Sequence, residues 1–215
     1  DEIQHYLAWR VDHQFAASST ARFLSALRRF YQYLNREKLR SDDPTVLLEG
    51  PKLPKKLPSD LSETEVEALL SAPLVDDPLE LRDKAMLELL YATGLRVSEL
   101  VGLTMENVSL RQGVVRVTGK GGKERLVPLG EESQHWLERY LAQARPQLAA
   151  GKPVPADAGG NVPLFLTAGR RAPTRQAFWS AIKRHAVAAG IDPDTVTPHG
   201  LRHSFGLLYP SAAAD

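Results

Sequence analysis

Apolar residues recur at helical intervals along most of the chain, and short stretches rich in glycine or proline separate these segments. Residues 81–103 show the pattern most clearly. Their first half carries an apolar helical face made of Ala85, Met86, Leu89 and Leu90. The sequence Ala92-Thr93-Gly94 interrupts this face before a second apolar stretch begins, which predicts a helix, a glycine-marked turn and another helix.

Arg96 lies at the junction between these two predicted helices. Apolar residues are expected to pack the turn from behind: Val97, Leu100, Val101 and Leu103. A guanidinium keeps its charge at any physiological pH and presents a planar fork that suits a phosphate or a carboxylate. A structural ion pair with Glu99 or Glu88 would explain the arginine equally well, so this residue alone does not decide between the two interpretations.

Two further helices are predicted before residue 50. The first ends near residue 16, with Ile3, Leu7 and Val11 facing inward, and the second runs from a cap cluster at residues 18–20 to about Leu39. The apolar face of the second helix contains Phe23, Leu24, Leu27, Phe30, Tyr31 and Leu34. Its opposite side carries Arg22, Arg28, Arg29, Arg36 and Lys38. Such a basic side is typical of a solvated surface, and it also suits a helix lying along a DNA backbone.

A proline-rich, basic segment at residues 51–60 can be neither a regular helix nor a central strand, and we interpret it as a linker. It separates a partial helical domain at 1–50 from a second domain at 61–215. The second domain begins with a cap at Ser62 and acidic residues in the next turn, which favour a helix there.

The two best strand candidates are residues 113–118 and 125–129, joined by a glycine-rich tip that carries Lys120 and Lys123. The tip fails the Walker pattern, because no Gly-Lys-Ser/Thr opens a helix there. It is therefore either a mobile loop that can approach another backbone or a solubilising surface turn. With these strands the predicted fold class is mainly α with a small antiparallel β-sheet.

Three more elements are predicted after the hairpin. Residues 131–148 form an amphipathic helix, residues 162–166 are a candidate short strand, and a last helix runs from Thr174 to about Ala189. In this last helix the inward positions are expected to be Phe178, Ile182 and Val187. Thr174, Arg175 and Gln176 at its start suit phosphate or base contacts, and they equally suit an ordinary cap and first turn.

Composition changes this picture mainly through charge. The formal net charge is only +1, yet residues 57–95 carry 9 acidic against 2 basic side chains, while residues 96–125 carry 6 basic against 3 acidic. Residues 170–202 carry 6 basic against 2 acidic. This segregation favours a polyanion-binding protein. The absence of cysteine excludes disulfides and thiolate metal sites, and no apolar run long enough for a membrane span occurs, so we expect a cytoplasmic protein.

The sequence Thr197-Pro198-His199-Gly200-Leu201-Arg202 places His199 and Arg202 three residues apart, on one face of a predicted helix. Together with ATGLRVSEL around Arg96 and VVRVTGKGGKERLVPLG around Lys120, this segment resembles the tyrosine recombinase (phage integrase) family, and in particular the bacterial Xer recombinases. The resemblance covers nearly the whole chain. It implies a catalytic domain at 61–215 preceded by a partial core-binding domain.

The resemblance implies the catalytic residues Arg96, Lys120, His199 and Arg202. In this chemistry two fixed arginines neutralise the charge that develops on the DNA phosphate, without a metal or cofactor. A tyrosine attacks phosphorus to form a 3′-phosphotyrosyl link, and a lysine protonates the leaving oxygen. Candidate DNA contacts are Arg22, Arg28, Lys123, Arg125, Thr174, Arg175 and Gln176.

The sequence departs from the family after Arg202, where a second histidine or tryptophan and then the tyrosine nucleophile are expected. Only 13 residues follow, and Tyr209 lies too close to Arg202 along the predicted helix to serve as the nucleophile. We therefore expect the catalytic domain to be C-terminally incomplete here. The partners implied by the resemblance are double-stranded DNA with a dif-like site, an XerC-type recombinase in a heterotetramer, and the FtsK translocase at the nucleoid. Two alternatives remain, a fragment that only binds DNA and an integrase of a mobile element.

Overall fold

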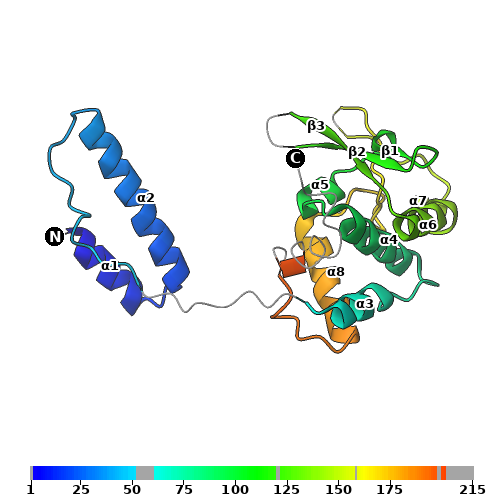
Figure 1. Cartoon of the computed structure of the whole chain (residues 1–215), viewed down its shortest axis with the longest axis horizontal. Helices are drawn as coiled ribbons and strands as arrows, with labels where there is room; N and C mark the ends of the chain where they lie inside the picture. The colour runs from blue at the N-terminus through cyan, green and yellow to red at the C-terminus, as the bar shows by residue number, and fades with distance from the viewer. Residues whose placement is uncertain (1, 52–60, 120–121, 158, 198–199, 202–215) are drawn as a thin grey trace. The chain divides into compact units, whose positions relative to one another are not determined.

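A computed structural model describes residues 2–51, 61–119, 122–157, 159–197 and 200–201 (Figure 1). Contacts divide the chain into an N-terminal unit, Asp1–Leu57, and a C-terminal unit, Pro58–Asp215. Most of the predicted linker lies outside the described residues, so its boundaries stay a prediction.

The N-terminal unit contains two helices, α1 (Glu2–Asp12) and α2 (Ala17–Arg36). Arg10 is only 7% exposed and joins them, because its guanidinium donates to the hydroxyls of Thr20 (3.3 Å) and Ser19 (3.1 Å). The guanidinium also lies 4.4 Å from the centre of the Phe15 ring, a favourable cation–π distance.

Two predictions for this unit were wrong. The serine and threonine hydroxyls do not cap α2, which begins at Ala17 after an N-cap residue, Ala16, that makes no side-chain hydrogen bond. The hydroxyls of Ser19 and Thr20 accept hydrogen bonds from Arg10 instead. Val11 faces outward and is 68% exposed, since the adjacent Arg10 occupies the inward position.

Helices dominate the C-terminal unit, with α4 (Pro78–Thr93) at its centre (Figure 1). Nearly every residue of α4 from Leu81 to Leu90 is buried, and the helix contacts α3 (Glu63–Ser71), α5 (Val97–Val101), α6 (Glu131–Arg139) and α7 (Arg145–Ala149). Ser62 and Glu65 form the expected capping box at the start of α3, and Asp77 caps α4. Helix α8 covers Arg175–Ala188.

The predicted hairpin is confirmed. After a short 3₁₀ turn at Met105–Asn107 (η1), strands β1 (Val108–Ser109), β2 (Val114–Thr118) and β3 (Glu124–Pro128) form an antiparallel sheet in that order. Val115 pairs with Val127 and Val117 with Arg125, and the side chains of Val115, Val117 and Val127 are buried. The fold is therefore mainly α with a small antiparallel sheet, as the sequence predicts.

The helix predicted at 131–148 is present as α6, a π-helical turn at Tyr140–Ala144 (η2) and α7. The strand predicted at 162–166 is wrong, since this segment forms only an isolated bridge between Thr104 and Pro163. Side chains, and not a neighbouring strand, form hydrogen bonds with other backbone groups of this segment. Tyr140 donates to the Leu164 carbonyl (3.2 Å) and accepts from the Leu166 amide (3.0 Å).

The inward face of α8 also differs from the prediction. Phe178 and Ile182 are buried as expected, but Val187 is 61% exposed. His185 and Ala186 occupy the inward positions one turn after Ile182, which rotates Val187 to the outside.

We expect Tyr140→Phe to lower the free energy of unfolding of the C-terminal unit by about 1–3 kcal/mol, because it leaves the buried Leu166 amide without its acceptor. Burial raises the pKa of the Tyr140 phenol to about 12, so the hydroxyl stays a donor at neutral pH. Urea denaturation in a Trp9→Phe background would measure the change through Trp136 and Trp179, which both lie in this unit. A loss below about 0.5 kcal/mol would show that water replaces the hydroxyl.

Candidate phosphate-binding site around Arg96

Gly94 ends α4 and sets the direction of the chain that leads to Arg96. It adopts a left-handed conformation (φ 58°, ψ 25°), and its amide donates to the Leu90 carbonyl at 3.0 Å. Glycine takes this conformation without steric cost, which explains why the turn needs it. The next residue, Leu95, is 1% exposed, and Leu100 and Leu103 are also buried, so the turn is fixed from behind as predicted.

Arg96 is the N-cap residue of α5 and is held by Glu99. Its backbone amide donates to one oxygen of the Glu99 carboxylate (2.7 Å), and its guanidinium Nη1 donates to the other (3.1 Å). The Arg96 side chain remains 57% exposed, and among the described residues its Nε and Nη2 have no protein acceptor. The guanidinium is thus oriented by one edge while the other edge faces solvent.

Glu99 also binds a second arginine, from the hairpin. Arg125 on β3 donates through Nη1 and Nη2 to the two carboxylate oxygens, at 3.2 and 3.1 Å. The Glu99 side chain is only 8% exposed. One carboxylate therefore ties the helical turn to the sheet and holds two guanidinium groups next to each other.

The pKa of Glu99 is lowered from its ordinary value. Burial, the largest effect, raises it, but the hydrogen bonds from Arg125 and from the Arg96 amide together outweigh burial. Glu99 is therefore ionised at neutral pH and stays a double acceptor. Of the two ion-pair partners considered for Arg96, Glu99 is correct and Glu88 is wrong, because Glu88 pairs with Lys84 at 2.6 Å.

The base of the hairpin tip is ordered next to this cluster. The Gly119 amide donates to the Lys123 carbonyl (2.7 Å), and the Gly122 amide donates back to the Gly119 carbonyl (3.2 Å). Lys123 is exposed and has no ion-pair partner in the part of the chain that the structure describes. Lys120, the predicted catalytic lysine, lies outside the described residues.

Residues 174–176 lie at the start of α8, which packs against α5. The Thr174 hydroxyl accepts from the Ala177 amide at 3.0 Å, so this residue is the N-cap of α8. Arg175 and Gln176 are exposed in the first turn. The capping interpretation holds for Thr174, and DNA contact by these three residues stays a prediction.

His199 and Arg202 also lie outside the described residues, but the two residues between them are described. Gly200 and Leu201 are buried, and Leu201 belongs to the apolar core of the C-terminal unit. The Thr197 hydroxyl accepts from the Gly200 amide at 2.9 Å. Leu201, one residue before Arg202 in the sequence, thus packs on the same core that supports Arg96.

Comparison with known proteins shows the family of this chain. Residues 59–213 match the Phage integrase family, and residues 1–38 match the "Phage integrase, N-terminal SAM-like domain". The chain belongs to the phage integrase family. The expected resemblance to the tyrosine recombinases is thereby confirmed.

The similar curated proteins are named tyrosine recombinase XerD. The chain is 60% identical to the one from Xanthomonas campestris pv. campestris over 98% of its own length, and 57% identical to the one from Yersinia pestis over 100%. It spans 65% and 69% of those two proteins, about two thirds of their length.

Solved structures agree on the fold. The XerA recombinase is 30% identical, with a TM-score of 0.60 over 99% of this chain and 69% of its own. The Tn1549 transposon integrase in complex with a circular intermediate DNA is 18% identical, with a TM-score of 0.74 over 98% of this chain and 72% of its own, a likeness in fold alone.

The N-terminal unit holds the two remaining candidate DNA contacts of this family member. Arg22 is exposed on α2. Arg28 is half-buried and donates to the Leu48 carbonyl, so it fixes the turn at Thr45–Leu48 to the helix. Arg22 is therefore the better placed of the two for a phosphate.

The sequence did not show that Glu99 is shared between two arginines. Its signal was the spacing of three residues from an N-cap, which suits a capping carboxylate, but nothing in the sequence indicated the contact with Arg125. Among the described residues no group of His, Asp or Glu is arranged to hold a metal ion, and no described helix is long and apolar enough to cross a membrane.

Proposed function

We propose that this chain belongs to a site-specific DNA recombinase of the Xer type, which cleaves and rejoins strands through a 3′-phosphotyrosyl intermediate. The observation that carries the proposal is the pair Arg96 and Arg125 on one buried carboxylate, with the outer edge of Arg96 open to solvent. A guanidinium held in this way can donate two parallel hydrogen bonds to phosphate oxygens with little loss of side-chain entropy.

The proposed mechanism divides the work among four residues of this chain. Arg96 and Arg202 bind the nonbridging oxygens and stabilise the charge that develops there, and His199 donates a hydrogen bond to the phosphate. The family's tyrosine attacks phosphorus, the bond to the 5′ oxygen breaks, and Lys120 gives its proton to that leaving oxygen. Rejoining reverses these steps with a partner strand.

The relatives support the Xer assignment over a mobile-element integrase, because those 57–60% identical are named XerD. We therefore propose a dif-like duplex as the DNA site, an XerC-type recombinase as the partner in a heterotetramer, and FtsK as the activating translocase. Chromosome dimer resolution at the nucleoid follows from these partners.

Two measurements, one of binding and one of cleavage, test the function. We expect the chain to bind a dif-like duplex with an affinity that falls steeply with salt, since each phosphate contact contributes a slope of about −0.9 in log K against log salt. A duplex with a nicked or phosphorothiolate site then tests for a covalent protein–DNA adduct on a denaturing gel.

The adduct experiment separates the remaining alternatives. An adduct abolished by Tyr209→Phe would identify this residue as the nucleophile and contradict our prediction. Salt-sensitive binding without an adduct supports the DNA-binding fragment. Binding that is weak and independent of salt would refute the proposal altogether.

A further inference from the structure

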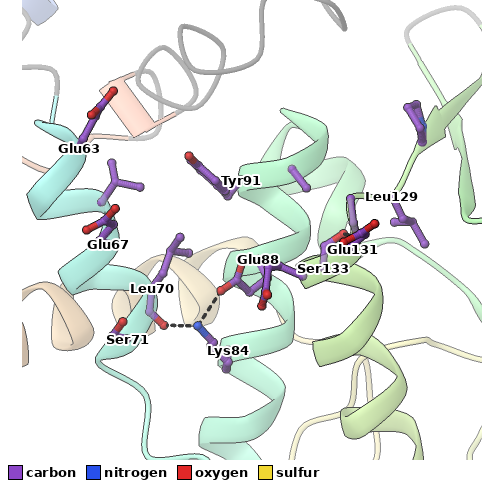
Figure 2. Close-up of a pocket in the computed structure, with 15 residues that line it drawn as sticks. Glu63, Glu67, Leu70, Ser71, Lys84, Glu88, Tyr91, Leu129, Glu131 and Ser133 are labelled. Atoms are coloured by element: carbon purple, nitrogen blue, oxygen red, sulfur yellow. Dashed lines mark hydrogen bonds and ion pairs between the residues drawn. The ribbon is translucent and has the colours of Figure 1, made fainter.

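A groove crosses the C-terminal unit between α3, α4 and the segment that leads from β3 into α6 (Figure 2). Its volume is about 710 Å³, within the range of roughly 300–1,000 Å³ that is common for binding pockets. Arg96, Arg125 and the start of α8 do not line it. The groove is therefore separate from the proposed phosphate site.

The floor of the groove is apolar. Val66 and Leu70 from α3 are buried there, and Tyr91 from α4 and Leu129 after β3 are partly buried and pack on the same core. Figure 2 shows the Tyr91 side chain extending from α4 toward α3. Val66 and Leu70 are four residues apart on one helix, so the floor presents a row of apolar positions suited to complementary apolar side chains.

The rim of the groove is acidic. Glu63 and Glu67 on α3 and Glu131 and Glu132 at the start of α6 all line the groove, and all four are exposed. Figure 2 shows Glu63 and Glu67 on α3, on the other side of α4 from Glu131. Within the described part of the chain none of the four has an ion-pair partner. With Glu88 and Lys84 added, five acidic and one basic side chain line the groove, a formal charge of −4.

Lys84 does not offset this charge toward a ligand. Its ammonium donates to the Leu70 carbonyl (2.8 Å) and to Glu88 (2.6 Å), and it lies 4.7 Å from the centre of the Trp136 ring. All its donors are thus directed into the protein. Among the described residues, the charged groups of the groove without an ion-pair partner are the four rim carboxylates, which repel DNA and anionic lipid.

We propose that this groove binds an amphipathic helix of a protein partner, one with an apolar stripe flanked by lysine or arginine. The apolar floor between two helices accepts the stripe, and the carboxylates on both walls pair with the flanking cations. The site would be a protein-interaction surface of opposite charge character to the DNA site, and because it shares no lining residue with Arg96, Arg125 or the start of α8, the two ligands would not compete for the same residues. This inference does not depend on strand cleavage.

The test uses the full chain and a fluorescein-labelled synthetic 18-residue peptide of leucine and lysine, with leucine at i, i+3, i+4 and i+7. Fluorescence anisotropy gives its affinity. We expect Glu67→Lys/Glu132→Lys to weaken binding at least tenfold. The matched control, Glu49→Lys/Glu106→Lys, changes the net charge equally at exposed positions outside the groove and is expected to change affinity less than twofold. Neither pair is expected to weaken binding to a dif-like duplex.

Three results would overturn the proposal. Equal weakening by both double variants would mean that only overall charge attracts the peptide. Equal binding of a peptide with serine in place of leucine would exclude a role for the apolar floor. Self-association of the free chain that the groove variants abolish, measured by sedimentation, would assign the groove to a second copy instead.

Discussion

Replacing Asp83 by alanine is expected to lower the free energy of unfolding of the C-terminal unit by about 3–5 kcal/mol. The Asp83 side chain is fully buried between α4 and α8. It accepts from Arg82 (2.6 Å), from Arg184 (3.1 Å) and from His185 Nε2 (3.1 Å). Removing the carboxylate leaves the nearly buried Arg82 guanidinium and the buried His185 ring without this acceptor, and that desolvation dominates the loss.

Arg184→Ala provides the matched control, because it removes one partner of the same carboxylate. The Arg184 side chain is 58% exposed, so its ion pair is weak, and we expect a loss below about 1 kcal/mol. Urea denaturation in the Trp9→Phe background compares the two variants. Equal losses would show that Asp83 contributes no more than a surface pair.

The pH dependence of stability gives a second readout on Asp83. Burial raises the pKa of Asp83, but the hydrogen bond from His185 and the charge of Arg82 together lower it by more than burial raises it. The pKa in the folded state therefore lies below the ordinary value of 3.8. A lowered pKa stabilises the fold at pH values above 3.8, and this stabilisation disappears as the pH falls through the folded pKa. The difference in unfolding free energy between the native chain and Asp83→Asn should therefore be constant near neutrality and shrink below about pH 4.

Local sequence patterns predicted the helices and the hairpin because those elements depend on near neighbours. The apolar spacing in α4, the cap of α3 and the valines of β2 are all local signals. The strand expected at 162–166 does not form, because the side chains of Tyr140 and Arg145, about 20 residues earlier, make hydrogen bonds with backbone groups of this segment. The cap expected for α2 failed because Arg10 uses the same hydroxyls.

The same limit applies to the site. A glycine-marked turn indicated Arg96, since its signal lies within a few residues. Arg125 was expected to contact DNA, but it donates both of its Nη groups to Glu99, a contact between residues 26 positions apart. Arg28 similarly uses its guanidinium on the carbonyl of Leu48. Sequence shows which cations are present, and only the fold shows which of them protein acceptors already engage.

Arg96→Ala is expected to remove one phosphate contact from the proposed DNA site. The slope of log affinity against log salt should become shallower by about 0.9, and any covalent adduct formed with a phosphorothiolate duplex should fall about 10²–10³-fold. Arg96→Lys should recover part of the binding and little of the adduct, because an ammonium cannot donate two parallel hydrogen bonds. The fold should be unaffected, since the side chain is 57% exposed and Arg125 still neutralises Glu99.

Arg111→Ala is the control for this experiment, because Arg111 is an exposed arginine before β2 with no ion-pair partner among the described residues. We expect its salt slope to match that of the native chain. Glu99→Gln tests the orientation of Arg96 apart from its charge, because it keeps Arg96 but removes the carboxylate that orients it. Any covalent adduct should then form to a smaller extent, while the salt slope stays unchanged. If instead Arg96→Ala and Arg111→Ala had equal effects on both readouts, Arg96 would be a surface cation and its ion pair with Glu99 purely structural.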